Sequence, residues 1–157
     1  MHSSVGHVLI LFLPIVVIAG FVATYLPGFF EIALGSVLDS PRITDAVRSG
    51  AGFGWHEHNQ HVHDGCERFF RPGYNANLID AWLPALDGVV EKLNTGGRVA
   101  DVGCGHGVST TLMAQAFPNS QFVGIDYHDA SIETARERAA AAGVANASFE
   151  VADATTY

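Results

Sequence analysis

Residues 98–107 place a short apolar strand directly before three closely spaced glycines, and this pattern constrains the fold more than any other part of the chain. The strand is predicted at Arg98–Val102, and Gly103, Gly105 and Gly107 follow it. Glycines at a turn from a strand into a helix let the backbone approach a ligand closely, and the unpaired N–H groups of the next helix point to the same place. We therefore expect a ligand-binding loop at this turn.

The segments after this loop alternate between strands and helices at short intervals. Strands are predicted at 98–102, 121–125 and 148–152, and helices at 108–117 and, capped by Asp129, 129–142. This alternation predicts parallel strands joined by right-handed crossovers, and the largely apolar strands predict that both sheet faces are covered. The expected fold class is α/β: the N-terminal half of a Rossmann-like doubly wound parallel sheet, with three strands, preceded by helices.

The region before the first strand is predicted to be mainly helical, with breaks at proline and glycine. Short helices are expected at 29–38, 41–49 (capped by Ser40), 75–83 and 84–93, with a turn at Pro72 and Gly73. The expected domains are an apolar helix at 1–30, a helical connector and His-rich lid or linker at 31–64, and the half-domain at 65–157.

Residues 8–30 form an uncharged, mostly apolar run that is long enough to cross a membrane. Interruptions are expected at Pro14, Gly20, Pro27 and Gly28, and no Lys or Arg precedes the run to set a membrane topology. Three interpretations stay open: a membrane anchor, a helix buried against the protein or a partner, and a signal peptide. An apolar helix of this kind also makes a homo-oligomer plausible.

Charge and cysteine content narrow the class of protein further. The formal net charge is −8, with only eight Lys and Arg, which are scattered along the chain. Such a chain is a poor candidate for binding nucleic-acid phosphates, so no nucleic-acid partner is expected. Cys66 and Cys104 cannot form a disulfide framework, and free thiols in a reducing, cytoplasmic compartment are the simpler interpretation.

Two acidic residues lie where a nucleoside ligand would need them. Asp101 comes two residues before the first glycine, and Asp126 follows Gly105 by 21 residues at the end of the second predicted strand. A carboxylate at that distance is typical of hydrogen bonding to a ribose hydroxyl. The dinucleotide pattern G-x-G-x-x-G is not met, because position 108 is Val108. A nucleoside-containing cofactor is therefore predicted.

The pattern D-x-G-x-G-x-G at residues 101–107 resembles the class I S-adenosylmethionine-dependent methyltransferases. The segments 124–127 and 151–153 resemble the second and third motifs of that family. Residues 54–58 and 67–73 resemble the bacterial two-domain members, which carry a winged-helix-like module before the catalytic domain; the chain is expected to be truncated relative to them.

The resemblance implies S-adenosylmethionine as cofactor and a set of residues that bind it: Asp101, Gly103, Gly105, Gly107, Asp126, Tyr127 and Asp153. Gly103 and Gly105 would lie against the methionine end of the cofactor, and Asp101 would orient its amino-acid group. Asp126 would accept hydrogen bonds from the ribose hydroxyls, Tyr127 would pack on the adenine, and Asp153 would accept from the adenine amino group.

The expected function is methyl transfer to a small-molecule acceptor that the sequence does not identify. The alternatives are an inactive cofactor-binding fragment and a membrane-tethered interaction protein. No catalytic residue is assigned, although His106 or one of the histidines at 56–63 could act as a base. A metal site is not expected at these histidines, because H-E-x-x-H fails at Gln60 and a polar lid or linker fits better. The protein is expected in the cytoplasm, with membrane association through residues 8–30 as an open alternative.

Overall fold

The computed structural model describes the backbone of residues 4–155 and the side chains of residues 16–155. The chain divides into two compact units, Met1–Pro72 and Gly73–Tyr157. The first is helical, and the second contains the glycine loop and the sheet.

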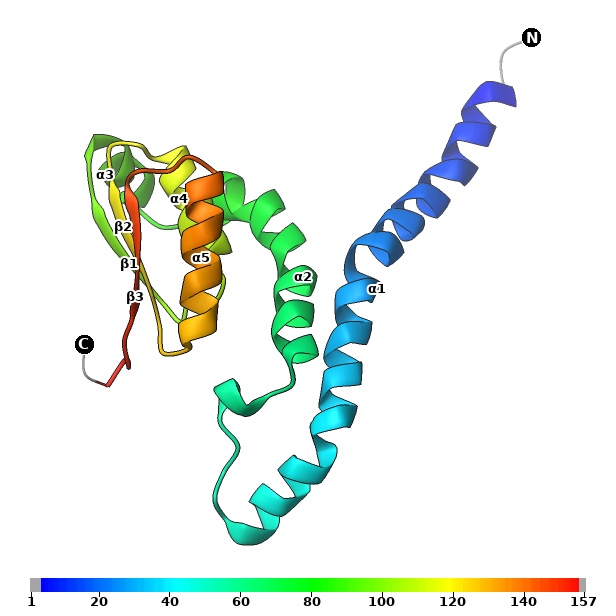
Figure 1. Ribbon diagram of the computed structural model, residues 1–157. Coiled ribbons are helices and arrows are strands. Elements are labelled where there is room, and N and C mark those ends of the chain that lie inside the picture. The colour runs from blue at the N-terminus through cyan, green and yellow to red at the C-terminus, as the bar shows by residue number, and fades with distance from the viewer. Residues whose placement is uncertain (1–3, 156–157) are drawn as a thin grey trace. The chain divides into compact units, whose positions relative to one another are not determined.

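The first unit begins with one continuous helix, α1 (Ser4–Ser49), of 46 residues (Figure 1). The expected interruptions at Pro14, Gly20, Pro27 and Gly28 and the separate helices at 29–38 and 41–49 are therefore wrong. A proline removes one backbone donor from a helix, but tertiary packing can outweigh that local cost. Within α1, the hydroxyls of Ser36 and Thr44 donate to carbonyls four residues earlier, at 2.8 Å in each case.

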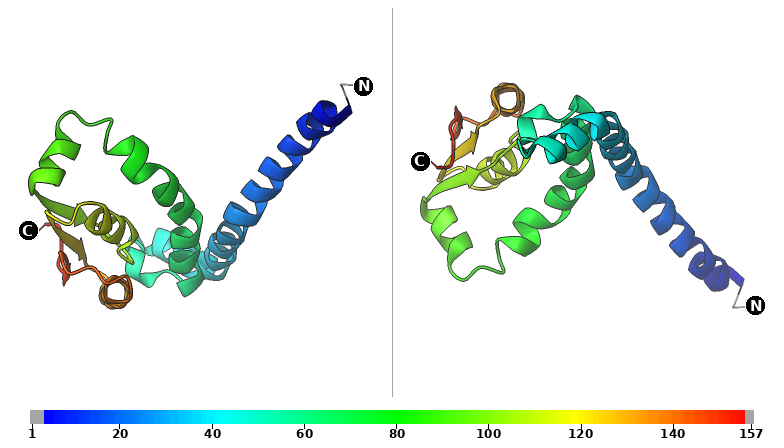
Figure 2. Two further views of the ribbon diagram at one scale, coloured as in Figure 1. Left: turned by 90° about the horizontal axis from the view of Figure 1, so that it is seen from above. Right: turned by 90° about the horizontal axis from the view of Figure 1, so that it is seen from below.

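Helix α2 (Gln60–Asn77) follows a short 3-10 turn at Trp55–Glu57 and runs alongside α1 (Figures 1 and 2). Gly28, Gly35 and Gly65 form the contact, because a Cβ at each would lie only 2.6–2.7 Å from an atom of the facing helix. This close approach supplies packing that favours the continuation of α1 past Pro27. The expected turn at Pro72 and Gly73 is also wrong, since α2 continues through both residues.

The buried carboxylate of Asp39 connects the C-terminal part of α1 to the segment that joins α1 and α2. Asp39 is only 2% exposed, and its Oδ2 accepts the backbone N–H of Asn59 at 2.8 Å and lies 3.1 Å from Nδ1 of His58. Arg42 lies beside the same carboxylate at 3.6 Å and stacks on the Phe53 ring. The backbone N–H of Asn59 holds the pKa of Asp39 below its usual value.

In the second unit, the end of α2 is followed by a π-helix at Leu78–Trp82 and a short helix α3 (Val89–Thr95). These replace the helices expected at 75–83 and 84–93. The chain between them forms turns, and α3 begins only after Gly88, which has a positive φ of 71°. Leu78 of the π-helix and Leu93 of α3 are both buried, so both elements contribute to the core.

The sheet contains β1 (Arg98–Val102), β2 (Gln121–Asp126) and β3 (Ala147–Val151), all parallel and in the order β1-β2-β3. The helices α4 (Val108–Ala116) and α5 (Asp129–Ala141) connect successive strands. The predicted α/β fold with a three-stranded parallel half-sheet is confirmed. One detail differs: the N-cap position of α5 is His128, which makes no side-chain capping hydrogen bond, and Asp129 is the first helical residue.

The core of this unit lies between the helices and one face of the sheet. Phe122 of β2 packs in one cluster with Met113, Phe117 and Leu93, and Phe149 of β3 packs in a second cluster against α5. Ile132 and Ala135 of α5 are fully buried there. The aromatic rings of β2 and β3 thus hold α4 and α5 onto the sheet.

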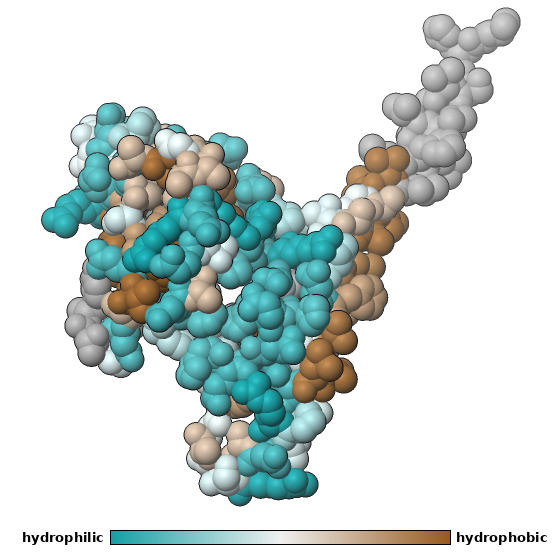
Figure 3. All heavy atoms as spheres, viewed as in Figure 1, coloured by the Kyte–Doolittle hydropathy of each residue, from teal (hydrophilic) through white to brown (hydrophobic). Residues whose placement is uncertain are grey.

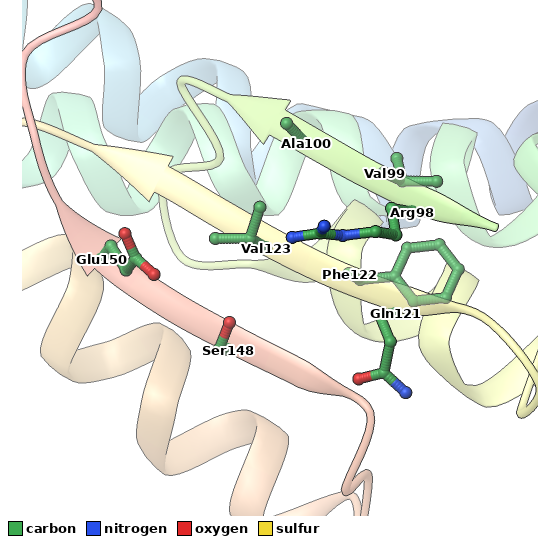
Figure 4. Close-up of a pocket in the computed structure, with 8 residues that line it drawn as sticks. All are labelled: Arg98, Val99, Ala100, Gln121, Phe122, Val123, Ser148 and Glu150. Atoms are coloured by element: carbon green, nitrogen blue, oxygen red, sulfur yellow. The ribbon is translucent and has the colours of Figure 1, made fainter. Parts of the chain in front are cut away.

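In the part of the chain that the structure describes, the expectation that both sheet faces are covered is wrong. Residues in register across the strands include Ala100, Val123 and Ser148, which lie in a row across one face (Figure 4). Arg98 and Glu150 flank this row and are exposed. This shallow, open face lies along the strands, whereas the glycine loop lies at their carboxyl ends.

Candidate functional site

The glycine loop is joined to the carboxyl end of β2 by a set of short hydrogen bonds. The backbone N–H groups of Gly103 and Cys104 both donate to the carbonyl oxygen of Ile125, at 2.7 and 3.0 Å. The next N–H, from Gly105, donates to Oδ2 of Asp126 at 2.9 Å. The loop after β1 is thereby fixed against the end of the neighbouring strand, where ligands bind in open α/β sheets.

Gly103 and Gly105 both adopt left-handed backbone conformations, with φ of 78° and 53°. A Cβ built at either position would meet no atom within 4 Å, so their outer side faces open space. Gly107 also has a positive φ, 71°, but it is buried, and a Cβ there would lie 2.6 Å from the Phe149 ring. The first two glycines therefore leave room for a ligand, whereas the third allows α4 to pack closely on the sheet.

Asp126 is 8% exposed and has a structural role in addition to any contact with a ligand. Its Oδ2 accepts from Gly105, its Oδ1 accepts from the N–H of His128 at 3.0 Å, and its carbonyl accepts from the N–H of Ala152 at 3.0 Å. A carboxylate has about four acceptor positions, so two protein donors leave capacity for a ligand. Asp126 thus connects the ends of all three strands through one residue.

Asp101 lies at the end of β1 and is held by the first turn of α4. Its Oδ2 accepts the hydroxyls of Ser109 and Thr110 at 2.7 and 2.6 Å. From the residues whose side chains the structure describes, no donor reaches its Oδ1. This arrangement orients the carboxylate and leaves one of its oxygens available.

Cys104 lies inside the loop and is buried, and it is unsuited to act as a nucleophile. Burial raises the pKa of its thiol to about 12, and the nearby carboxylates of Asp101 and Asp126 add to the increase. The thiolate is the reactive form of cysteine, so this residue is inert at neutral pH. A Cβ at Gly124 of β2 would lie 2.9 Å from the Cys104 sulfur, which shows how tightly the sulfur is packed.

The two remaining predicted residues are exposed at the same end of the sheet. Tyr127 directly follows Asp126 and is 45% exposed. Asp153 follows β3, and its Oδ1 accepts both the N–H and the hydroxyl of Thr155 at 2.8 Å. These bonds lower the pKa of Asp153 from its usual value. Hydrogen bonds thus join Asp126 to the loop and Asp101 to the first turn of α4. The contacts of these residues, and of Tyr127 and Asp153, with a ligand stay predictions.

Two supporting side chains were missed by the sequence reasoning. Ser109 and Thr110 orient Asp101, and the signal available for them was a pair of hydroxyl residues in the first turn of the helix after the loop. The histidines at 56–63 have a different environment: His58 faces Asp39, and the His63 and Trp55 rings lie 4.8 Å apart. Over the described residues, no group of three or more His, Cys, Asp or Glu side chains is arranged to hold a metal ion.

Comparison with known proteins shows what this part of the chain is similar to. Residues 93–157 match the family model described as "Methyltransferase domain". The chain is therefore similar to methyltransferase domains over residues 93–157, and this similarity supports the class I S-adenosylmethionine-dependent methyltransferases that its glycine loop resembles. The matched segment contains the glycine loop, all three strands and all the predicted cofactor residues.

Individual relatives are similar to this chain over part of their length. A trans-aconitate 2-methyltransferase of Variovorax paradoxus is 43% identical over 60 residues, which are 38% of this chain and 21% of the relative. That of Methylobacterium radiotolerans is 40% identical over 57 residues, covering 36% of this chain and 20% of the relative. The matched parts therefore span about a fifth of the length of these curated relatives.

Among solved structures, an O-methyltransferase family protein from Burkholderia thailandensis is similar in fold, with a TM-score of 0.57. The similarity covers 84% of this chain and 42% of that one, at 15% sequence identity. At this identity the likeness shows the fold alone.

Proposed function

We propose that the protein binds S-adenosylmethionine at the glycine loop and transfers its methyl group to a small-molecule acceptor. The observation that carries this proposal is the open space beside Gly103 and Gly105, next to a carboxylate, Asp126, that is hydrogen-bonded to the same loop. The match of residues 93–157 to a methyltransferase-domain family model supports the same function.

The residues at the loop fit the chemistry of this cofactor. S-adenosylmethionine carries no phosphate, and residues 103–117 contain no Lys or Arg that a phosphate would require. Asp126 has acceptor capacity left for ribose hydroxyls, and Asp101 has an available oxygen for an ammonium group. The exposed ring of Tyr127 offers a flat surface for the adenine.

When bound, the cofactor supplies a methyl group activated by its sulfonium. The residues of this chain then bind and orient it, so that the acceptor atom can attack in line with the breaking carbon–sulfur bond. A general base is needed only when the acceptor must lose a proton. The carboxylate of an organic acid is already ionised at neutral pH and needs none, which suits a loop whose thiol stays protonated.

The acceptor class is the finer part of the proposal. The curated relatives named above are trans-aconitate 2-methyltransferases, so a small carboxylic acid is the first class to test. The experiment incubates the full chain with S-adenosylmethionine labelled in its methyl group and with trans-aconitate. Label in a methyl ester supports the proposal. Absence of transfer to trans-aconitate and to a panel of small acids, amines and phenols would contradict it.

A second candidate function is cofactor binding without transfer by this chain alone. The open sheet face and the free outer edge of β1, among the described residues, favour it because both are sites where further structure would pack. Calorimetric binding of the cofactor with no labelled product for any acceptor would favour this second candidate over the first.

A further inference from the structure

The N-terminal part of α1 is uncharged over a length that matches a lipid bilayer. Residues 1–30 contain no Asp, Glu, Lys or Arg, and the helix already begins at Ser4. At 1.5 Å per residue, residues 4–24 extend for about 31 Å, close to the thickness of the hydrocarbon core. The backbone of this segment hydrogen-bonds internally along the helix, as a membrane-spanning segment requires.

Among the residues of this segment whose side chains the structure describes, several consecutive apolar side chains are exposed. Val16, Val17 and Ile18 are consecutive and each about 62–63% exposed, and Phe21 and Val22 are also exposed. Successive residues of a helix lie about 100° apart, so these side chains surround most of the helix axis. A helix that docks into one protein groove presents a single apolar stripe, whereas an apolar surface all round is typical of a membrane span.

The pattern of exposure changes at Tyr25, where α2 begins to cover one side of α1. The Tyr25 and Phe69 rings meet edge to face at 5.6 Å, and Gly28 packs against the backbone of Phe69. Directly beyond this level, Glu31 and Arg68 form an ion pair at 3.0 Å. In Figure 3, hydrophobic residues lie along the coloured upper and middle part of α1, and the C-terminal end of the helix is hydrophilic. Charged residues and an amphipathic tyrosine at this level are typical of the end of a membrane span.

We propose that residues 4–24 of α1 cross a lipid bilayer and hold the rest of the protein at the cytoplasmic membrane surface. The orientation follows from basic residues: all eight Lys and Arg of the sequence come after residue 41, on the C-terminal side of the proposed span. Basic residues stay preferentially on the cytoplasmic side of a membrane span. The part of the chain after the span then lies on the cytoplasmic side of the membrane. There it can act on a soluble acceptor or on an acceptor dissolved in the membrane.

The test uses the full chain with a C-terminal epitope tag, produced in a bacterial host. Washed membranes are treated with alkaline carbonate and floated in a density gradient, so that membranes rise and aggregated protein sinks. The expected result is a tagged protein of full-length mass in the floating fraction that is released only by detergent. Proteolysis of intact spheroplasts is expected to leave the C-terminal tag uncut.

Paired variants distinguish membrane insertion from nonspecific hydrophobic association with membranes. Ile18→Arg with Phe21→Arg places two charges inside the proposed span and is expected to remove the protein from the floating fraction. Leu34→Arg with Val37→Arg makes the same change on exposed positions of α1 outside the span and is expected to leave flotation intact. Equal behaviour of the two double variants would overturn the proposal.

Three other outcomes would also overturn it. A mature protein that lacks the first 25 or so residues would identify a cleaved signal peptide. A carbonate-soluble protein that forms a stable dimer through α1 would assign the apolar surface to a second copy. Degradation of the C-terminal tag in intact spheroplasts would reverse the orientation. Because these readouts need no methyl transfer, they remain informative whatever the outcome of the cofactor experiments.

Discussion

The carboxylate of Asp126 accepts a hydrogen bond from the backbone N–H of Gly105 at 2.9 Å, across 21 residues of sequence. The residue that we expect to bind the ribose therefore also fixes the conformation of the loop that holds the rest of the cofactor. The same carboxylate accepts the N–H of His128, where α5 begins. Ligand binding and local folding consequently depend on one side chain at the end of β2.

We predict that Gly107→Ala destabilises the sheet unit more than Gly143→Ala. Both glycines have a positive φ, 71° and 68°, so the backbone strain of a Cβ is similar at the two positions. At Gly107 the Cβ would also lie 2.6 Å from the Phe149 ring, whereas at Gly143 it meets nothing within 4 Å. Overpacking of this kind costs about 1–3 kcal/mol. Denaturant unfolding followed by circular dichroism measures the difference, and equal losses of stability would contradict the packing role of Gly107.

Thr110→Val and Thr111→Val, adjacent substitutions of the same shape, are expected to have different effects. The Thr110 hydroxyl donates to Asp101 at 2.6 Å, and loss of a hydrogen bond to a charged group costs about 1.5–3 kcal/mol. The Thr111 hydroxyl is buried and has no partner among the described residues, so its removal should be neutral or stabilising. The free energies of unfolding of the two variants test this, and a more destabilising Thr111→Val would contradict it.

Cys104 should resist alkylation while the protein is folded. Because burial raises the pKa of its thiol to about 12, only about one molecule in ten thousand is ionised at pH 8. Iodoacetamide labelling followed by mass spectrometry should modify Cys66, which is less buried, before Cys104. Faster or equal labelling of Cys104 would show that its thiol is accessible and ionised.

The same raised pKa predicts a loss of stability in alkaline solution. The unfolded thiol ionises near its ordinary value of 9, whereas the folded thiol ionises only near 12. The contribution to stability is therefore complete below pH 9 and is lost as the pH rises from 9 toward 12. Unfolding midpoints of the wild type and of Cys104→Ala at pH 7 and pH 10 measure it, and a smaller decline in the variant is expected.

Asp39→Ala should loosen the turn between α1 and α2, because Asp39 binds both the N–H of Asn59 and the ring of His58. Faster hydrogen exchange of the Asn59 amide is the expected result. Asp45→Ala is the matched control, since Asp45 forms only a surface ion pair with Arg48. Unchanged exchange at Asn59 in Asp39→Ala would show that the carboxylate does not hold this turn.

Local patterns were sufficient to predict the three strands and the two helices that connect them, but not the helices before β1. β1 has the predicted bounds, and β2 and β3 shift by only one residue, because each short apolar run is bounded by glycine, proline or polar turn residues. The prediction of a three-stranded parallel half-sheet depended on these turn residues, because they mark where each strand begins and ends. Each connection between neighbouring strands contains one short helix.

The helical unit could not be predicted in the same way, because contacts distant in sequence determine it. Pro27 and Pro41 are local signals for a break, but α1 continues through both, with Gly28 and Gly35 packed against α2. The partners Asp39 and His58 lie 19 residues apart, and nothing in their spacing indicates that they meet. Likewise, the spacing of Asp126 suggested a ligand but not its hydrogen bond to Gly105.

The central claim is that Asp126 and the glycine loop form the binding site for S-adenosylmethionine. Isothermal titration of the full chain with S-adenosylmethionine tests it most directly, alongside Asp126→Ala and, as a matched control, Asp129→Ala, an exposed acid three residues away. Binding is expected in the wild type and in Asp129→Ala and should be lost in Asp126→Ala. It should be weakened in Tyr127→Ala, a variant that keeps the Asp126 carboxylate. Unchanged affinity in both Asp126→Ala and Tyr127→Ala, or no binding by the folded wild type, would contradict the account.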